Sequence, residues 1–198
     1  MTLSQVQCKI LHGGKDMLYI IRHGKTDWNL KHKLQGRTDI PLNEEGRAMA
    51  RKAHDEYINV HIDKCYCSPL IRARETAELL LEGRDIPIIP DDRLSEMAFG
   101  IFEGKENSFD DKDCPINELF FSPQTYVAKE GWGESLDELF ARTGSFLKEI
   151  LPEVESGKDI LIVGHGAMNS SIITQVRQKP VSEFWSEGIE NCVMKKLI

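Results

Sequence analysis

Two histidines beside glycines are the residues in this chain best placed to carry out chemistry. One is the middle residue of Arg22-His23-Gly24 and the other is the middle residue of Gly164-His165-Gly166. Each follows a short apolar run that is typical of a buried strand. Glycine beside a histidine leaves room for a ligand close to the backbone. Because the carboxyl ends of parallel strands meet at one edge of a sheet, we expect both imidazoles to lie at that edge.

Two arginines are expected at the same edge. Arg22 directly precedes His23, and Arg72 lies one turn into a helix that Ser68-Pro69 is predicted to start. That helix follows the second predicted strand, so its N-terminus should present free N–H groups and positive potential there. Two guanidinium groups, two imidazoles and helix ends together predict a pocket for a compact anion, for which phosphate is the best candidate.

A phosphate pocket gives the histidines and one carboxyl group a chemical role. A neutral imidazole such as that of His23 can attack phosphorus and form a covalent phosphohistidine. Arginines would offset the charge on the phosphoryl oxygens. Glu96 is the candidate proton donor to the leaving group, because it follows a predicted strand among apolar neighbours. Each of these residues alone is more often structural, so the prediction depends on their convergence.

Apolar runs and amphipathic segments alternate along the chain and would position these side chains. Helices are predicted from Asn43 to about Ile58, from Ser68 to a cap at Gly83, from the Ser135 capping box to a break or kink at Pro152, and over about 167–176. Strands are predicted at 17–21, 62–67, 86–89, 159–163 and 193–198, with a loop over 25–43. This alternation favours an α/β class with a largely parallel sheet.

Composition limits the classes of partner. The chain has 198 residues and a formal net charge of −7. We expect one domain over 1–198, with an N-terminal extension at 1–16 and an insert at 104–132. No basic run favours nucleic acid, and no apolar run approaches the ~20 residues of a membrane span, so we expect neither partner. A homodimer is one option that the sequence leaves open.

The five cysteines do not show the pattern of a disulfide framework. Their number is odd, and there is no signal-peptide pattern, so the cytoplasm is the expected compartment. Cys65 and Cys67 could form half of a zinc site, but no second pair stands at the required spacing. We expect them to pack as small hydrophobic residues on one face of a strand. We expect no metal and no cofactor, since the two histidines also lack the helical spacing of a metal motif.

At this point the sequence resembles the histidine phosphatase superfamily, also called phosphoglycerate mutase-like. The matching motifs stand in the family's order over about residues 17–170. They are Arg22-His23-Gly24, Thr26 with Asn29, Gln35-Gly36, Asp39-Ile40-Pro41-Leu42, Gly46, Ser68-Pro69-Leu70-Ile71-Arg72-Ala73 with Thr76-Ala77, Leu94, Glu96, Phe99-Gly100, Glu103-Gly104, Gly133-Glu134-Ser135 and Gly164-His165-Gly166. The sequence departs from the family pattern at Phe102, Ala167 and Ser170.

The resemblance implies a three-layer α/β/α sandwich with a mostly parallel central sheet and a metal-independent enzyme. It implies that His23 is the phosphorylated nucleophile and Glu96 the acid. It implies that Arg22, Arg72 and His165 complete the phosphate pocket. Substrate contacts would come from Gly24, Thr26, Asn29, Gln35, Gly36 and Gly166.

Three functions stay open for such a site. We favour hydrolysis of a small phosphorylated metabolite, similar to the short α-ribazole-phosphatase-like and broad-specificity members, because the 104–132 insert has no cluster of arginines to grip a sugar acid. The alternatives are a phosphoglycerate-type mutase, which must keep its phosphohistidine dry, and a non-catalytic binder of a phospho-ligand. Phe120, Phe121 and Tyr126 either line the leaving-group side or pack the insert against the body.

Overall fold

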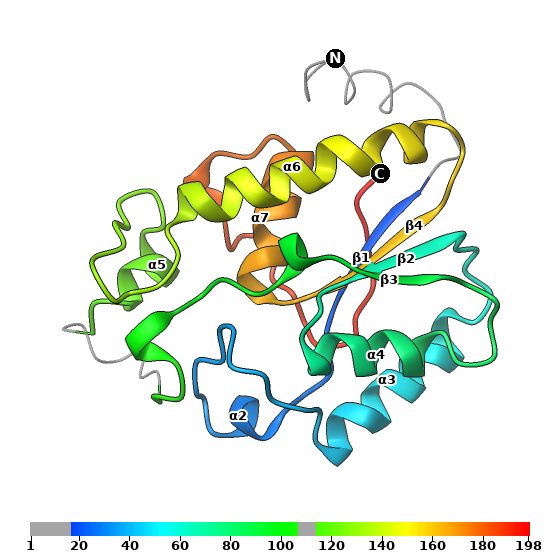
Figure 1. Cartoon of the computed structure of the whole chain (residues 1–198), viewed down its shortest axis with the longest axis horizontal. Helices are drawn as coiled ribbons and strands as arrows, with labels where there is room; N and C mark the ends of the chain where they lie inside the picture. The colour runs from blue at the N-terminus through cyan, green and yellow to red at the C-terminus, as the bar shows by residue number, and fades with distance from the viewer. Residues whose placement is uncertain (1–16, 107–113) are drawn as a thin grey trace.

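A five-stranded sheet forms the centre of the computed structural model, which describes residues 17–106 and 114–198 (Figure 1). The predicted extension at 1–16 and part of the 104–132 insert lie outside these ranges. The strands of the described chain are β1 (Leu18–Arg22), β2 (Lys64–Cys67), β3 (Ile88–Pro90), β4 (Ile160–Gly164) and β5 (Lys195–Lys196), in the spatial order β3-β2-β4-β1-β5. Neighbouring strands are parallel except β5, which runs antiparallel to β1. The predicted α/β class with a mostly parallel sheet is therefore confirmed.

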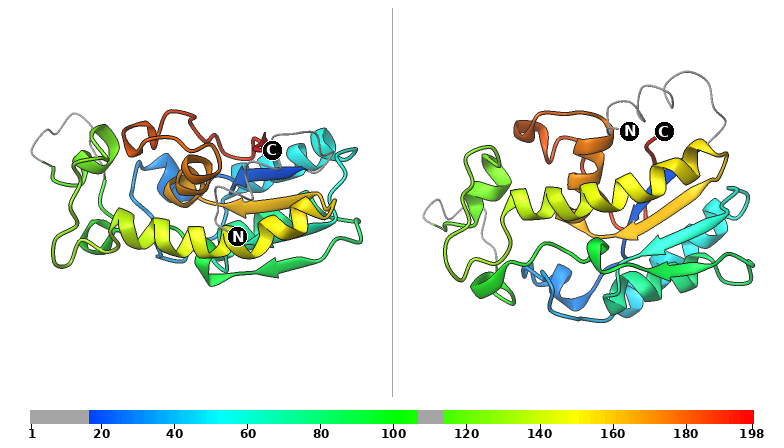
Figure 2. Two further views of the ribbon diagram at one scale, coloured as in Figure 1. Left: turned by 90° about the horizontal axis from the view of Figure 1, so that it is seen from above. Right: turned by 45° about the horizontal axis from the view of Figure 1, so that its top comes forward.

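Helices cover both faces of this sheet. The α-helices of the described chain are α2 (Asp27–Leu30), α3 (Glu44–Tyr57), α4 (Ile71–Leu80), α5 (Asn117–Phe121), α6 (Leu136–Glu155) and α7 (Gly166–Val176). Short 3₁₀ helices span Asp92–Leu94, Gly100–Phe102 and Val181–Glu183. Figure 1 shows α6 and α7 on one side of the sheet and α3 and α4 on the other. In Figure 2, α5 and its surrounding loops lie at one end of the molecule, beyond the sheet.

The side chains of β4 explain why this strand reads as a continuous apolar run. Ile160 and Ile162 pack into the core under α6 and α7, whereas Leu161 and Val163 pack into the core against α3 and α4. All four are fully buried. A strand in the middle of a parallel sheet has two dry faces, so neither face can carry polar residues.

The two cysteines of β2 behave as predicted. Cys65 and Cys67 are buried on the side of α3 and α4, while Tyr66 between them packs edge-on against Phe146 of α6, with ring centroids 5.4 Å apart. Within residues 17–106 and 114–198, His, Cys, Asp and Glu side chains form no group of three that could hold a metal ion. No helix in those ranges combines the length and apolar character needed to cross a membrane.

Two local predictions are wrong, and so is the break, one of the two options at Pro152, each for an identifiable reason. Helix α4 begins at Ile71 rather than at Ser68-Pro69, because its first N–H donates to the distant carboxylate of Asp39 at 2.7 Å. The stretch predicted as a loop contains α2, which Thr26 caps. Helix α6 continues through Pro152 to Glu155, since the proline is exposed in the last turn and Val154 beyond it is buried.

Candidate active site

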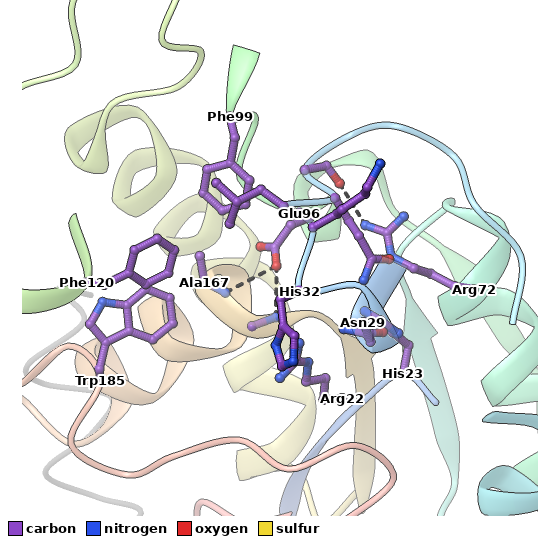
Figure 3. Close-up of a pocket in the computed structure, with 15 residues that line it drawn as sticks. Arg22, His23, Asn29, His32, Arg72, Glu96, Phe99, Phe120, Ala167 and Trp185 are labelled. Carbon is purple, nitrogen blue, oxygen red and sulfur yellow. Dashed lines mark hydrogen bonds between the residues drawn. The ribbon is translucent and has the colours of Figure 1, made fainter. Parts of the chain in front are cut away.

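A cavity of about 380 Å³ opens where β1 ends and α7 begins. Figure 3 shows its labelled side chains converging from segments far apart in the sequence. The predicted site residues line it with three exceptions, Gly24, Thr26 and His165, which are not among the lining residues. The lining residues are Arg22, His23, Asn29, His32, Lys33, Leu34, Gln35, Gly36, Arg72, Glu96, Phe99, Phe120, Gly166, Ala167 and Trp185.

The imidazole of His23 is held in one tautomer. Its Nδ1 lies 2.6 Å from the carbonyl oxygen of Gly24, and because a carbonyl can only accept, Nδ1 must carry the proton. The backbone N–H of His23 donates to the Gly164 carbonyl at 2.9 Å, which fixes this residue against the end of β4. Burial, and then the neighbouring charges of Arg72 and Arg22, hold the pKa of His23 well below its ordinary value. The ring is therefore neutral, with the lone pair of Nε2 available as a nucleophile.

The ring of His165 lies beside that of His23. The two ring centroids are 5.1 Å apart and the planes are tilted by 59°. The side chain is fully buried, and neither ring nitrogen has a hydrogen-bond partner among the residues that the structure describes. Burial, and then the positive charge of Arg72, lower its pKa well below the ordinary value, so this ring is neutral as well. Asn169 fixes the backbone here by accepting from the N–H of His165 at 3.2 Å and donating to the carbonyl of Ile21 at 3.1 Å.

Two arginines supply the positive charge. Nη1 and Nη2 of the fully buried Arg72 donate to the carbonyls of Thr38 and Gly36 at 2.9 and 2.7 Å. Burial lowers the pKa of Arg72 to about 10, which leaves the guanidinium charged at neutral pH. Arg22 donates through Nη1 to the carbonyl of Ile189 at 3.2 Å, and burial lowers its pKa as well.

Glu96 lies across the N-terminus of α7. Oε2 accepts from the N–H groups of Gly166 and Ala167 at 2.9 and 3.3 Å, and Oε1 accepts from those of Met168 and Met97 at 3.0 and 2.8 Å. Free N–H groups at a helix start are the natural partners of an anion, so the first turn of α7 positions this carboxyl group beside the cavity. Figure 3 shows Glu96 between the arginine side of the cavity and an aromatic side.

The loop after β1 is fixed by its own backbone bonds. Gly24 donates to the hydroxyl of Thr76 at 3.0 Å, and a Cβ on Gly24 would lie 2.5 Å from the carbonyl oxygen of Gly46. The amide oxygen of Asn29 accepts from the N–H and the hydroxyl of Thr26 at 3.0 and 3.1 Å. Gly24 and Thr26 thereby hold the loop that carries His23 and Asn29.

Within residues 17–106 and 114–198, several buried polar atoms of this site find no hydrogen-bond partner. They include Nε of Arg22, Nε of Arg72, Oε1 of Gln35 and both ring nitrogens of His165. Buried polar groups are nearly always paired in folded proteins, so such a concentration calls for a ligand explanation. Most of these atoms are donors or belong to neutral imidazoles, and a tetrahedral oxyanion supplies several acceptors at once.

Comparison with known proteins identifies the family of this chain. The family profile described as histidine phosphatase superfamily (branch 1) matches residues 18–198. The chain belongs to the histidine phosphatase superfamily. This confirms the resemblance that the motifs indicated.

Relatives within the superfamily carry both phosphatase and mutase names. The chain is 30% identical over 181 residues to "2,3-bisphosphoglycerate-dependent phosphoglycerate mutase 2" of Gloeobacter violaceus, which covers 89% of this chain and 83% of the relative. It is 30% identical over 175 residues to "Adenosylcobalamin/alpha-ribazole phosphatase" of Salmonella typhimurium, covering 87% and 85%. The solved structure of Bacillus stearothermophilus YhfR superimposes with a TM-score of 0.81 at 30% identity, covering 91% of this chain and 89% of that one.

Sequence analysis missed part of the wall of this histidine phosphatase site. His32, Lys33 and Leu34 come from the loop after α2, and Trp185 comes from the irregular segment after α7. The aromatic residues of the insert divide between the two alternatives, except Phe121, which fits neither. Phe120 lines the cavity, whereas Tyr126 is buried against Trp132 and Phe121 is 65% exposed outside it.

Proposed function

We propose that this chain is a metal-independent phosphatase that hydrolyses phosphomonoesters of small metabolites through a phosphohistidine on His23. The observation that carries the proposal is the ring of His23, whose Nδ1 faces the Gly24 carbonyl, at the wall of a cavity that also presents Arg22 and Arg72. A nucleophile with a free lone pair and two cations beside it fits attack on a phosphate ester.

The first step transfers the phosphoryl group. Nε2 of His23 forms a bond to phosphorus while the bond from phosphorus to the ester oxygen breaks. Arg22 and Arg72 offset the charge on the other phosphoryl oxygens, and His165 packs beside the ring of His23. Glu96 acts as the general acid: it donates a proton to the departing ester oxygen and is left as a carboxylate.

The second step regenerates the enzyme. A water molecule attacks phosphorus, its proton passes to the Glu96 carboxylate, and the bond from phosphorus to Nε2 of His23 breaks to release inorganic phosphate. The backbone N–H groups at the start of α7 hold the Glu96 carboxyl group in the same place for both steps, because they donate hydrogen bonds to its oxygens.

The cytoplasm is the compartment that we propose, because the odd number of cysteines does not suit a disulfide framework.

Replacing His23 tests the proposal. In the His23→Ala variant we expect release of phosphate from para-nitrophenyl phosphate to fall to background, and rapid-quench labelling should trap phosphohistidine in the parent chain only. His61→Ala is the matched control, because His61 is exposed and pairs with Asp63 far from the cavity. A His23→Ala variant that retains the parent rate would refute the mechanism.

A mutase is the second candidate, since the Gloeobacter relative of similar identity carries a mutase name. It predicts that isomerisation of 3-phosphoglycerate exceeds phosphate release once 2,3-bisphosphoglycerate is added as a primer. We expect phosphate release to dominate, because the described part of the insert adds Phe120 to the cavity wall and no cation. Tight phosphate binding without any trapped phosphohistidine would instead indicate a non-catalytic binder.

A further inference from the structure

The side of the cavity opposite the arginines is aromatic. Phe99, Phe120 and Trp185 form it, and we name these three residues the aromatic wall. Figure 3 shows them together on one side of Glu96, with Arg22, His23 and Arg72 on the other. The rings of Phe120 and Trp185 are stacked, with centroids 5.3 Å apart and planes at 25°, and Phe99 is tilted against Phe120 at 6.5 Å.

The aromatic wall is held rigidly from behind. The indole N–H of Trp185 donates to the carbonyl of Leu119 at 2.8 Å. Phe184 packs edge-on against Trp185 at 4.7 Å and is itself packed against Phe140 of α6 at 5.8 Å. Because its indole N–H is already bonded, Trp185 offers a ligand its ring and no hydrogen bond, and the two phenylalanines offer none either.

The position of Glu96 determines which part of a substrate meets this wall. A general acid must lie within hydrogen-bond reach of the ester oxygen that it protonates. The phosphoryl group lies on the arginine side, so the alcohol portion of the ester extends past Glu96 toward the aromatic wall. Hydroxyl groups of a sugar acid would lose their water there without gaining partners, which is costly, whereas an apolar ring would be stabilised by burial and stacking.

We propose that the preferred substrates are phosphomonoesters whose alcohol portion carries a flat aromatic or apolar ring, which stacks on Phe120 and Trp185. This inference rests on the proposed function and defines its substrate class. His32 and Lys33 line the same cavity, and the ammonium group of Lys33 lies over the ring of Trp28 at 5.8 Å.

Three primary alkyl esters separate stacking from the chemistry of the phosphate. They are 2-phenylethyl phosphate, propyl phosphate and glycerol 1-phosphate. We expect kcat/KM for the phenylethyl ester to exceed those of the other two by about tenfold, the scale of burying and stacking one ring. Equal values for the three esters in the parent chain would overturn the inference.

Variants of Phe120 locate the effect. Phe120→Ala should lower kcat/KM for the phenylethyl ester about tenfold more than for propyl phosphate, because only the phenyl ring loses a stacking partner. Phe120→Leu keeps apolar volume and folding while losing the stacked ring, so it should show a partial loss. Phe121→Ala is the matched control, because the neighbouring side chain is 65% exposed and outside the cavity. Equal losses for all esters in the Phe120 variants would also count against the aromatic wall.

A binding measurement keeps this inference separate from the proposed function. If none of the esters is hydrolysed, the proposed phosphatase activity fails. Calorimetric titration of the unreacted chain with 2-phenylethyl and propyl phosphate then decides the inference alone. Tighter binding of the phenylethyl ester, lost in Phe120→Ala and kept in Phe121→Ala, supports the aromatic wall, and equal binding refutes it.

Discussion

The carboxylate of Glu103 accepts a hydrogen bond from the backbone N–H of Thr38 at 2.9 Å, and the carbonyl of Thr38 accepts one from Arg72, also at 2.9 Å. The same carboxylate accepts from the hydroxyl of Thr38 at 2.5 Å, from the N–H of Arg37 at 3.1 Å and from the N–H of Phe99 at 3.0 Å. Glu103 thus ties the loop that holds the phosphate-side guanidinium to the segment that carries the proposed acid, without lining the cavity itself.

We predict that Glu103→Gln slows catalysis by misplacing Arg72. The amide nitrogen of glutamine would face backbone N–H donors and cannot accept from them, so the hydrogen bonds to either Thr38 or Phe99 are lost. We expect kcat/KM for para-nitrophenyl phosphate to fall about tenfold to a hundredfold, and the inhibition constant of inorganic phosphate to rise with it. Glu130→Gln, at an exposed carboxylate, should change neither quantity. If stability falls while the phosphate inhibition constant is unchanged, Glu103 has no positioning role.

Arg72→Lys should lower kcat strongly although the substitution keeps the positive charge. Arg72 uses both terminal nitrogens on the carbonyls of Gly36 and Thr38, and a lysine ammonium cannot reproduce that planar fork. We expect kcat to fall about a hundredfold to a thousandfold, the scale of removing a donor to transition-state charge. Arg74→Lys, two residues along the same helix and exposed, should retain parent kinetics. A loss for Arg72→Lys below about tenfold would contradict this role.

The convergence of the phosphate-side residues could be predicted because it follows from topology. Strand β1 ends at Arg22 and β4 ends at Gly164, and parallel neighbours must end at the same edge. The positions of His23 and His165 next to each other therefore follow from the strand topology and do not depend on the conformation of the loops. The start of α7 lies at the same edge because the helix follows β4 directly, which places it beside Glu96.

The rest of the site depends on tertiary contacts that leave no local pattern. Helix α4 starts where Asp39 can cap it, and Asp39 is far from it in sequence. The segment after α7 places Trp185 in the cavity wall. From the same segment, the carbonyl of Ile189 accepts from Arg22, and Asn191 donates to the carbonyl of His23 at 2.6 Å. This segment lacks regular periodicity, so nothing in the sequence indicated that it borders the site.

Gly24→Ala should destabilise the fold through a backbone clash. The added Cβ would lie 2.5 Å from the carbonyl oxygen of Gly46, and neither backbone segment can move freely. We expect the free energy of unfolding to fall by about 1–3 kcal/mol, as for other overpacked sites. Gly166→Ala is the control for stability, since its Cβ would meet the nearest atom at an ordinary 3.5 Å. Equal urea midpoints for Gly24→Ala and the parent chain would contradict the predicted clash.

The two buried histidines should make stability depend on pH in mildly acidic solution. The pKa values of His23 and His165 are lowered well below 6.5 in the folded chain by burial and by Arg72, whereas unfolding restores ordinary values. Below pH 6.5 the unfolded chain therefore binds protons that the folded chain does not. The stability from keeping these rings neutral is fully present above that pH and is lost as the pH falls through it.

Urea unfolding between pH 7.5 and 5.5 measures this effect. Each histidine should contribute up to about 1.4 kcal/mol per pH unit once the pH is well below 6.5, and His165→Asn should remove about half of the slope. The window excludes the carboxylates with lowered pKa values, such as Glu153 at about 2, because their contribution is lost only at more acidic pH. If His165→Asn leaves the slope unchanged, or if stability rises on acidification, these rings are not held neutral. The proposed mechanism would then fail as well, because only a neutral ring leaves Nε2 of His23 free to attack phosphorus.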